Sequence, residues 1–159
     1  MRYMKEDRKY IDRMNLCMNQ IDGLYYMAAR KLGIKDNTLA LFYVLNDGEP
    51  HTQKEICEEW LIPKTPINTI VRENVDLGYI RLENAGHRKE KRILLTERGK
   101  AYADRILRQV YAAEESAMAR TLEEFSPKLL DGLEAFTGYL REAFHREILD
   151  DMEKEETAQ

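Results

Sequence analysis

The chain has 159 residues, of which 43% are hydrophobic and 34% are charged, and its formal net charge is −4. This length and composition are typical of a globular protein with one substantial core, built as one domain or as two intimate subdomains. A membrane-spanning helix needs about 20 apolar residues in a row, and no apolar run in this chain is nearly that long. The charged N-terminus does not resemble a secretory signal. We therefore expect a cytoplasmic protein that does not associate with membranes.

The two cysteines, Cys17 and Cys57, lie far apart in the sequence and form no CxxC pair. This spacing indicates neither a disulfide framework nor a zinc ribbon. We expect both thiols to be buried as small apolar groups.

The charge is distributed unevenly along the chain. Residues 106–159 hold 13 acidic and 6 basic side chains, whereas residues 51–105 hold 11 basic and 9 acidic side chains. A mildly basic segment in an acidic chain is a weak indication of a surface for nucleic acid. The basic residues gather in "HRKEKR", just before the apolar run "ILL".

The first segment, residues 1–34, is predicted to form one long helix. Its apolar residues recur at three- and four-residue steps from Ile11 to Ala28, and Gly33 supplies a stop signal.

Two short helices follow this segment. The first has Asp36 or Asn37 as its predicted N-cap and ends at Gly48. The second is predicted to begin at Thr52 and Glu55, which have the spacing of a capping box. In a capping box the side chain of each residue accepts a hydrogen bond from the backbone N–H of the other.

A fourth helix is predicted to start after Pro63, with Thr65 as N-cap and Pro66 at the first helical position, and to end at Gly78. Its apolar residues repeat with the helical period. They are predicted to face inward: Ile67, Ile70, Val71 and Val75.

The hydrophobic period then changes from helical to twofold. The segments "YIRLE" and "RILLT" alternate as strands do, and the polar stretch between them contains Gly86 as a turn residue. This pattern predicts a β-hairpin with the basic cluster at its tip.

Two further helices complete the chain. Thr96 is the predicted cap of a helix from about Glu97 to Leu122, and Ser126 and Pro127 open the last helix.

The order of helix, short helix, turn, helix and basic hairpin predicts a winged helix-turn-helix. The expected fold is mainly α with a small two- or three-stranded β-wing. The winged helix-turn-helix core occupies residues 35–100, and dimerisation helices flank it in residues 1–34 and 101–159.

In such a module the second helix of the pair enters the major groove of DNA, and the hairpin reaches the backbone or the minor groove. The predicted recognition-helix contacts are Lys64, Thr65, Pro66, Asn68, Thr69 and Arg72. The predicted wing contacts are His87, Arg88, Lys89, Lys91 and Arg92. Asn68 suits adenine, Arg72 suits guanine or phosphate, and the threonines suit phosphate or a thymine methyl group. Solubilising charge on an exposed surface is the alternative explanation.

The terminal helices carry more apolar surface than the central module can cover. A second copy of the chain around a two-fold axis would cover it and would match the symmetry of operator half-sites. The expected interface residues are Ile11, Met14, Leu133, Phe136, Leu140, Phe144 and Ile148. A monomeric helical bundle is the alternative.

Aromatic residues near the junction of the terminal helices and the central module suggest a pocket for a small aromatic or lipophilic effector. These residues are Tyr25, Tyr26, Met27, Phe42 and Tyr43. Core packing explains the same residues equally simply.

Catalysis finds little support in the sequence. His51, His87 and His145 lack the spacing of metal ligands, and the chain has neither a GxSxG motif nor a glycine-rich phosphate loop. We predict a protein that is not an enzyme and that uses no metal and no cofactor.

Four segments carry a resemblance that covers nearly the whole chain: "LYYMAARKLG", "LALFYVLNDGEPHTQKEI", "IPKTPINTIVRENVDLGYI" and "RILLTERGKAYAD". With "LLTERG" directly after a basic wing, the chain resembles the multiple-antibiotic-resistance regulator (MarR) family. The resemblance implies a dimeric cytoplasmic transcriptional regulator that binds a pseudo-palindromic operator in double-stranded DNA. It also implies a repressor that a small phenolic or lipophilic ligand releases.

The chain departs from the family pattern at three positions. The wing of the family commonly carries Asp-x-Arg where this chain has His87 and Lys89, and lysine lacks the planar fork of arginine. We therefore expect the wing contact to shift to Arg88 or to become less specific. Asn74 stands where the family usually buries leucine.

Two other functions stay open. Winged helices also serve as protein-interaction modules, and a formal charge of +2 in residues 51–105 is modest for a DNA-binding segment. A thiol-based peroxide-sensing regulator is disfavoured, because the resemblance places its reactive cysteine at Asp22, and Cys17 lies more than a helical turn away.

Overall fold

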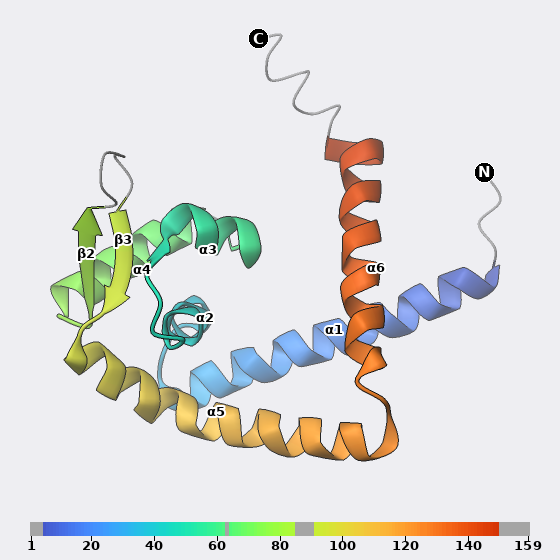
Figure 1. The fold of residues 1–159 in the computed structure, drawn as a ribbon, viewed down its shortest axis with the longest axis horizontal. Coiled ribbons are helices and arrows are strands. Elements are labelled where there is room, and N and C mark those ends of the chain that lie inside the picture. The colour runs from blue at the N-terminus through green and yellow to red at the C-terminus, as the bar shows by residue number, and fades with distance from the viewer. Residues whose placement is uncertain (1–4, 63, 85–90, 150–159) are drawn as a thin grey trace, which may run out of the picture. The chain divides into compact units, whose positions relative to one another are not determined.

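The computed structural model describes residues 5–62, 64–84 and 91–149, and for Lys5, Glu6, Lys64 and Thr65 it describes the backbone alone. The elements are shown in Figure 1. In chain order they are α1 (Lys5–Leu32), α2 (Asp36–Leu45), β1 (His51–Thr52), α3 (Gln53–Glu59), α4 (Lys64–Asp76), β2 (Ile80–Asn84), β3 (Lys91–Leu95), α5 (Glu97–Glu124), α6 (Lys128–Phe144) and a π-helical turn, η1 (His145–Leu149).

The fold is mainly helical with one small sheet, which confirms the predicted fold class. The chain forms two compact units, residues 1–111 and residues 112–159. The first unit holds α1 to β3 and the beginning of α5. The second holds the rest of α5, then α6 and the π-helical turn.

Two predicted helix starts are wrong by one or two residues. The N-cap of α2 is Lys35, whose side chain makes no capping hydrogen bond, rather than Asp36 or Asn37. Helix α4 begins at Lys64, so Thr65 and Pro66 lie inside its first turn instead of at its cap and first position. Pro66 fits there because backbone N–H groups of a first helical turn have no partner within the helix.

The start of α3 agrees with its prediction. The backbone N–H of Glu55 donates to the Thr52 hydroxyl at 3.1 Å, and the Glu55 carboxylate accepts from the backbone N–H of Thr52 at 2.7 Å. These two bonds form the predicted capping box.

The sheet has three antiparallel strands in the order β1-β3-β2. Strands β2 and β3 form the predicted hairpin, with Ile80 opposite Leu95 and Asn84 opposite Lys91. The short strand β1 adds to the other edge of β3, where Thr52 lies opposite Arg92. The beginning of α3 is thereby tied to the hairpin.

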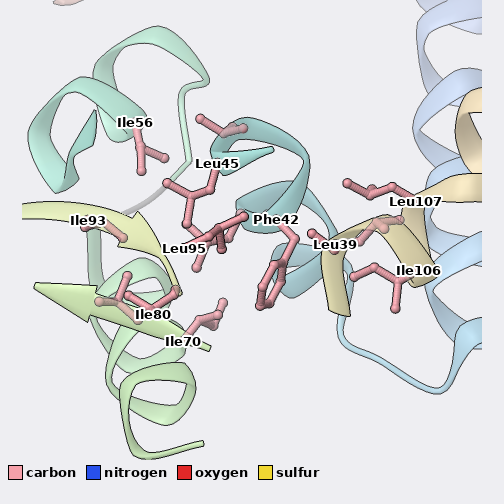
Figure 2. Packing of buried hydrophobic residues seen from close by; sticks show 14 of the residues in the cluster. Leu39, Phe42, Leu45, Ile56, Ile70, Ile80, Ile93, Leu95, Ile106 and Leu107 are labelled. Atoms are coloured by element: carbon pink, nitrogen blue, oxygen red, sulfur yellow. The ribbon is translucent and has the colours of Figure 1, made fainter. Parts of the chain in front are cut away.

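The core of the first unit forms around α2, which presents buried side chains toward both the sheet and α5. Figure 2 shows Phe42 and Leu45 beside Ile80, Ile93 and Leu95 of the sheet, with side chains of α5 on the other side of α2. The fully buried members include Leu41, Phe42, Leu45, Ile56, Ile67, Ile93 and Leu107. Because α4 and the hairpin share this core, their positions are set by side chains far apart in the sequence.

The terminal helices have few buried side chains. No residue of α6 is buried, and many apolar side chains of α1 are exposed. The prediction that both cysteines are buried is wrong, since Cys17 is exposed on α1 and Cys57 is half-buried. Cys17 lies on a helix segment that runs beyond the core.

The helices in the described part of the chain are too short or too polar to cross a membrane.

Candidate nucleic-acid interface

Helix α4 separates a buried apolar face from an exposed polar face. Ile67, Ile70 and Val71 expose at most 3% of their surfaces, which confirms their predicted inward orientation. Asn68, Thr69 and Arg72 are exposed, and Pro66 and Val75 are half-buried. The outer face therefore presents an amide, a hydroxyl and a guanidinium, three groups that can bond to base edges or phosphates.

Asn74, which stands where the family usually buries leucine, is buried inside α4. It exposes 3% of its surface, and its side-chain amide donates to the backbone oxygen of Ile70 at 2.8 Å. A buried amide needs such a partner, and the helix itself supplies one. The inward register of α4 thus continues through its last turn.

The exposed end of α4 also forms an ion pair with the segment before α2. The ammonium of Lys35 lies 2.9 Å and 3.0 Å from the two carboxylate oxygens of Glu73. Both side chains are largely exposed, so the pair contributes at most about 1 kcal/mol. The ion pair places the positive charge of Lys35 beside Glu73 of α4.

Several predicted contacts lie outside the described part of the chain. The side chains of Lys64 and Thr65 belong to this group, and so do His87, Arg88 and Lys89 of the wing. Their roles stay predictions from the sequence.

Of the predicted wing residues, Lys91 and Arg92 lie in the described strand β3 and are exposed. In the register of the hairpin, Lys91 lies opposite Asn84 and Arg92 lies opposite Glu83. Arg81 and Glu83, both on β2, form an ion pair. The described base of the wing thus carries both signs of charge, with Lys91 nearest the tip.

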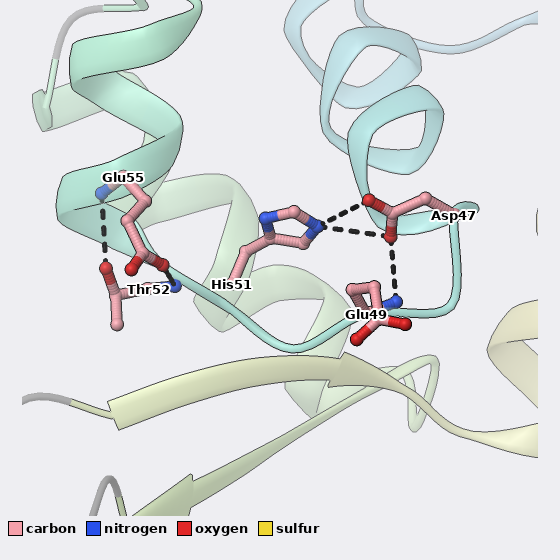
Figure 3. A network of polar contacts seen from close by, with 5 residues as sticks. All are labelled: Asp47, Glu49, His51, Thr52 and Glu55. Atoms are coloured by element: carbon pink, nitrogen blue, oxygen red, sulfur yellow. Dashed lines mark hydrogen bonds and ion pairs between the residues drawn. The ribbon is translucent and has the colours of Figure 1, made fainter.

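A polar network surrounds the short strand β1, and Figure 3 shows its members. The His51 Nε2 lies 3.1 Å and 2.9 Å from the two carboxylate oxygens of Asp47. The Asp47 carboxylate also accepts from the backbone N–H of Glu49 at 2.8 Å. This arrangement holds the turn after α2 against the strand that pairs with the wing.

The pKa of Glu55 lies below its ordinary value. The hydrogen bond from the backbone of Thr52 is the main cause, and the Thr52 hydroxyl, His51 and Arg92 add to it, while burial opposes it. The ionised carboxylate is therefore the form that stabilises the start of α3.

The five residues predicted to line an effector pocket lie in different surroundings. Phe42 is fully buried, with its ring edge-on to Tyr79 and Tyr102 at centroid distances of 6.2 Å and 5.0 Å. Tyr43 is half-buried and contacts Trp60 and Tyr111 edge-on, at 5.8 Å and 5.4 Å. The other three predicted residues, Tyr25, Tyr26 and Met27, are exposed on α1. Phe42 thus serves the core, and the effector pocket stays a prediction.

A small hollow of about 270 Å³ lies elsewhere in the first unit. Apolar side chains and charged side chains of both signs line it: Leu45, Asn46, Gly48, Glu49, Arg81, Leu94, Leu95, Lys100 and Asp104. None of the five predicted effector residues is among them. Its volume is below the range of about 300 to 1,000 Å³ that is usual for ligand pockets.

The predicted dimer-interface residues are accessible in the single chain. Ile11, Leu133, Leu140, Phe144 and Ile148 each expose between 38% and 49% of their surfaces. Met14 and Phe136 are half-buried. The apolar stripes on α1 and α6 therefore lack a covering partner within the described residues of their own units.

Within the described residues, no group of three or more His, Cys, Asp or Glu side chains is placed to hold a metal ion. The described residues bring together an exposed polar face of α4 and a hairpin whose second strand, β3, begins with the basic residues Lys91 and Arg92.

Residues 32–90, which run from the end of α1 through the helix pair and into the hairpin, match the model of the MarR family. This segment is therefore a MarR-family winged helix. The predicted resemblance to the MarR family is confirmed for it.

Solved MarR structures share the fold over most of the chain. A MarR family regulator from Neisseria meningitidis is 24% identical, with a TM-score of 0.72 over 90% of this chain and 99% of that one. Staphylococcus aureus MarR, solved in complex with salicylate and kanamycin, is 16% identical, with a TM-score of 0.62 over 89% of this chain and 93% of that one. Overoxidized AbfR bound to DNA is 13% identical, with a TM-score of 0.61 over 89% of this chain and 99% of that one. At these identities the similarity establishes the fold. A comparison with curated proteins gives no match.

Proposed function

We propose that this chain is a cytoplasmic transcriptional regulator of the MarR family that binds double-stranded DNA in a sequence-specific way. The observation that carries the proposal is the two-faced helix α4. Its apolar face is fixed in the core, and its polar face is exposed beside a hairpin that continues into the basic segment 87–92. A solved structure of the same fold, that of AbfR, contains DNA.

The exposed face of α4 supplies the specific contacts in this proposal. Asn68 pairs with adenine, and Arg72 pairs with guanine or with a phosphate. Lys64, Thr65, Pro66 and Thr69 lie at or near the start of the same helix, where phosphate contacts set its position in the groove. A rigid inward face matters for this role, because base recognition requires a defined helix orientation.

The wing supplies the contacts that do not depend on sequence. Arg88, Lys89, Lys91 and Arg92 provide positive charge for phosphates or for the minor groove, and His87 takes the place of an anchoring aspartate. Glu83 lies opposite Arg92 across the hairpin and forms an ion pair with Arg81. In this proposal Arg88, Lys89 and Lys91 carry most of this contribution, because Arg92 lies opposite the acidic Glu83.

The functional unit in this proposal is a homodimer on a pseudo-palindromic operator. Leu133, Leu140 and Phe144 are exposed on α6, a helix without a single buried residue in the described chain. Burying such a stripe stabilises by about 25 cal/mol for each Å² removed from water. A second copy, contributing the same stripe around a two-fold axis, covers it and presents two α4 helices to two half-sites.

A small aromatic or lipophilic effector releases the operator in this proposal, which makes the protein a repressor. Tyr25, Tyr26 and Met27 are exposed on α1 and are the aromatic and apolar side chains that would contact such a ligand in this proposal. The ligands found with Staphylococcus aureus MarR show that a protein of this fold accommodates small molecules.

Selection of bound sequences from random duplex DNA tests the proposal. We expect enrichment of one sequence with two-fold symmetry, bound with an affinity that falls steeply as salt rises. Asn68→Ala should relax the preference at a defined base pair in each half-site. If no duplex is enriched, or if binding does not depend on salt, the protein is a winged-helix interaction module instead.

A further inference from the structure

The residue that joins α4 to the wing, Tyr79, lies in a stack of rings and guanidinium groups on α5. The rings of Tyr79 and Tyr102 are stacked with centroids 4.4 Å apart and planes inclined by 15°. The guanidinium carbon of Arg98 lies 4.9 Å from the Tyr79 ring centroid, and that of Arg105 lies 5.2 Å from the Tyr102 ring centroid. Arg98, Tyr102 and Arg105 follow one another at helical spacing, so they share one face of α5.

The backbone around Tyr79 is tied to both neighbouring elements. Its N–H donates to the backbone oxygen of Asn74 in the last turn of α4, at 2.9 Å. Its backbone oxygen accepts from the N–H of Thr96, just before α5, at 3.0 Å. A side chain on Gly78 would begin 3.8 Å from the Arg98 guanidinium, so Arg98 also lies against the turn that ends α4.

Arg98 therefore holds the junction between the recognition helix and the first wing strand from the side of α5. A guanidinium is attracted to the electron-rich face of an aromatic ring, and at an exposed site this attraction changes an equilibrium constant by up to about fivefold. Arg98 is exposed, which places its contribution in that range. The core fixes the buried face of α4, and the stack adds a constraint at the end of the helix where the chain turns into β2.

We propose that Arg98 is a positioning residue for DNA binding. Through Tyr79 it fixes the end of α4 and the beginning of β2 on α5, so that the recognition helix and the wing meet DNA in one relative orientation. This inference rests on the proposed function, because DNA affinity is its readout. If only a fraction of the molecules holds α4 and β2 in the orientation that fits DNA, the apparent DNA affinity falls by that fraction.

Arg105 offers a matched control at the other end of the stack. It is also exposed and also lies over a tyrosine ring, but that ring belongs to Tyr102 in its own helix. Arg98→Met and Arg105→Met remove the same charge and the same kind of ring contact. Only the first removes a contact to the junction between α4 and β2.

The experiment compares the parent, Arg98→Met, Arg98→Lys and Arg105→Met on a selected operator duplex and on a random duplex. Arg98→Met should bind the operator up to about fivefold more weakly than Arg105→Met, the factor that corresponds to the lost ring contact. Arg98→Lys should fall between Arg98→Met and the parent, because lysine keeps the charge without the planar group. All proteins are compared well below their unfolding temperatures, so that a purely stabilising role leaves affinity unchanged.

Amide hydrogen exchange of the free proteins gives a readout that needs no DNA. The N–H groups of Tyr79 and Thr96 should exchange faster in Arg98→Met than in Arg105→Met, because both bonds lie at the junction. Equal operator affinity in the two methionine variants, or equal exchange at these amides, overturns the inference. If the parent binds no duplex at all, the proposed function fails and this inference fails with it.

Discussion

The backbone oxygen of Tyr79 occupies the space that a side chain at position 99 would need. A Cβ on Gly99 would lie 1.9 Å from that oxygen and 2.9 Å from the carbonyl carbon. The N–H of Gly99 donates to the hydroxyl of Thr96 at 3.0 Å, and this hydroxyl donates to the backbone oxygen of Gly78 at 2.7 Å. The "LTERG" segment therefore caps α5 and brings it into direct contact with the junction between α4 and β2.

Gly99→Ala should destabilise the protein by about 2 kcal/mol or more, because the neighbouring atoms are backbone and cannot move without displacing β2. Chemical denaturation measures this change. The control is Gly23→Ala, where nothing lies within 4 Å in the single chain. At Gly23 alanine should stabilise α1 by up to about 1 kcal/mol, since it is the better helix former. Equal stability of Gly99→Ala and the parent would contradict the close packing of α5 on the junction.

The capping box of α3 should contribute both stability and a dependence on pH. Thr52→Ala removes the hydroxyl that accepts from Glu55, and we expect a loss of about 1 kcal/mol at neutral pH. Because the pKa of Glu55 is lowered in the folded protein, the carboxylate contributes stability above the ordinary glutamate pKa of about 4.3. That contribution is lost as the pH falls through the lower pKa of the folded state.

Urea denaturation at several pH values between 3 and 7, about the range in which glutamate titrates, measures this dependence. Glu55→Gln can still accept a hydrogen bond but cannot titrate, so its stability should fall less steeply with acid than that of the parent. Thr121→Ala is the matched control for Thr52→Ala, because the Thr121 hydroxyl only donates back to Ala117 within α5. A parent and a Glu55→Gln variant with parallel pH profiles would refute the role of the carboxylate.

Local patterns in the sequence were sufficient to predict the elements that depend on nearby residues. The Thr52 and Glu55 spacing identified the capping box, and the spacing of Ile67, Ile70 and Val71 gave the inward face of α4. The exposed positions of Asn68 and Arg72 follow from that face alone. These features could be predicted because helix periodicity and capping act within a few residues.

Features that depend on distant residues could not be predicted in the same way. The sequence gives no signal that Lys35 meets Glu73, or that Tyr79 stacks between residues of α5. Helix α2 begins without a side-chain cap, which no capping rule anticipates. Leu61 adopts a left-handed backbone with φ of 50°, a conformation that the sequence would assign to glycine or asparagine. The ion pair and the ring stack depend on contacts between residues that are far apart in the sequence, whereas Leu61 is 75% exposed and nothing that packs on it explains its backbone.

The apolar stripe of α6 should hold two copies of the chain together. Leu140→Glu places a charge among Leu133, Phe144 and other exposed apolar residues of this helix, so burial of the stripe in a dimer becomes unfavourable. Sedimentation velocity should show a dimer for the parent and a monomer of 18.7 kDa for the variant at micromolar concentration. Tyr139→Glu, a change on the same helix at a residue outside the predicted interface, is the control and should leave the dimer intact. A parent that sediments as a monomer would refute the dimer.

Wing and recognition helix should differ in the kind of DNA affinity that they supply. Arg88→Ala combined with Lys89→Ala should weaken binding to all duplexes alike, because these residues are assigned to phosphates or to the minor groove. Each lost phosphate contact should lower the slope of log affinity against log salt by about 0.9 per subunit. Asn68→Ala or Arg72→Ala should instead cost about 1 to 3 kcal/mol on the selected operator if the side chain contacts a base.

Fluorescence anisotropy titrations at several salt concentrations, on operator and random duplexes, separate the two effects. His87→Asp combined with Lys89→Arg restores the pattern of the family, and it should tighten binding because an aspartate can orient an arginine through paired hydrogen bonds. Asn68 and Arg72 lie on a helix whose buried face is fixed by Ile67 and Ile70, so their loss should leave the fold and the salt slope for random DNA nearly unchanged. An Arg88 and Lys89 double variant that keeps the parent's affinity and salt slope would show that residues 87–92 are not a DNA-binding wing.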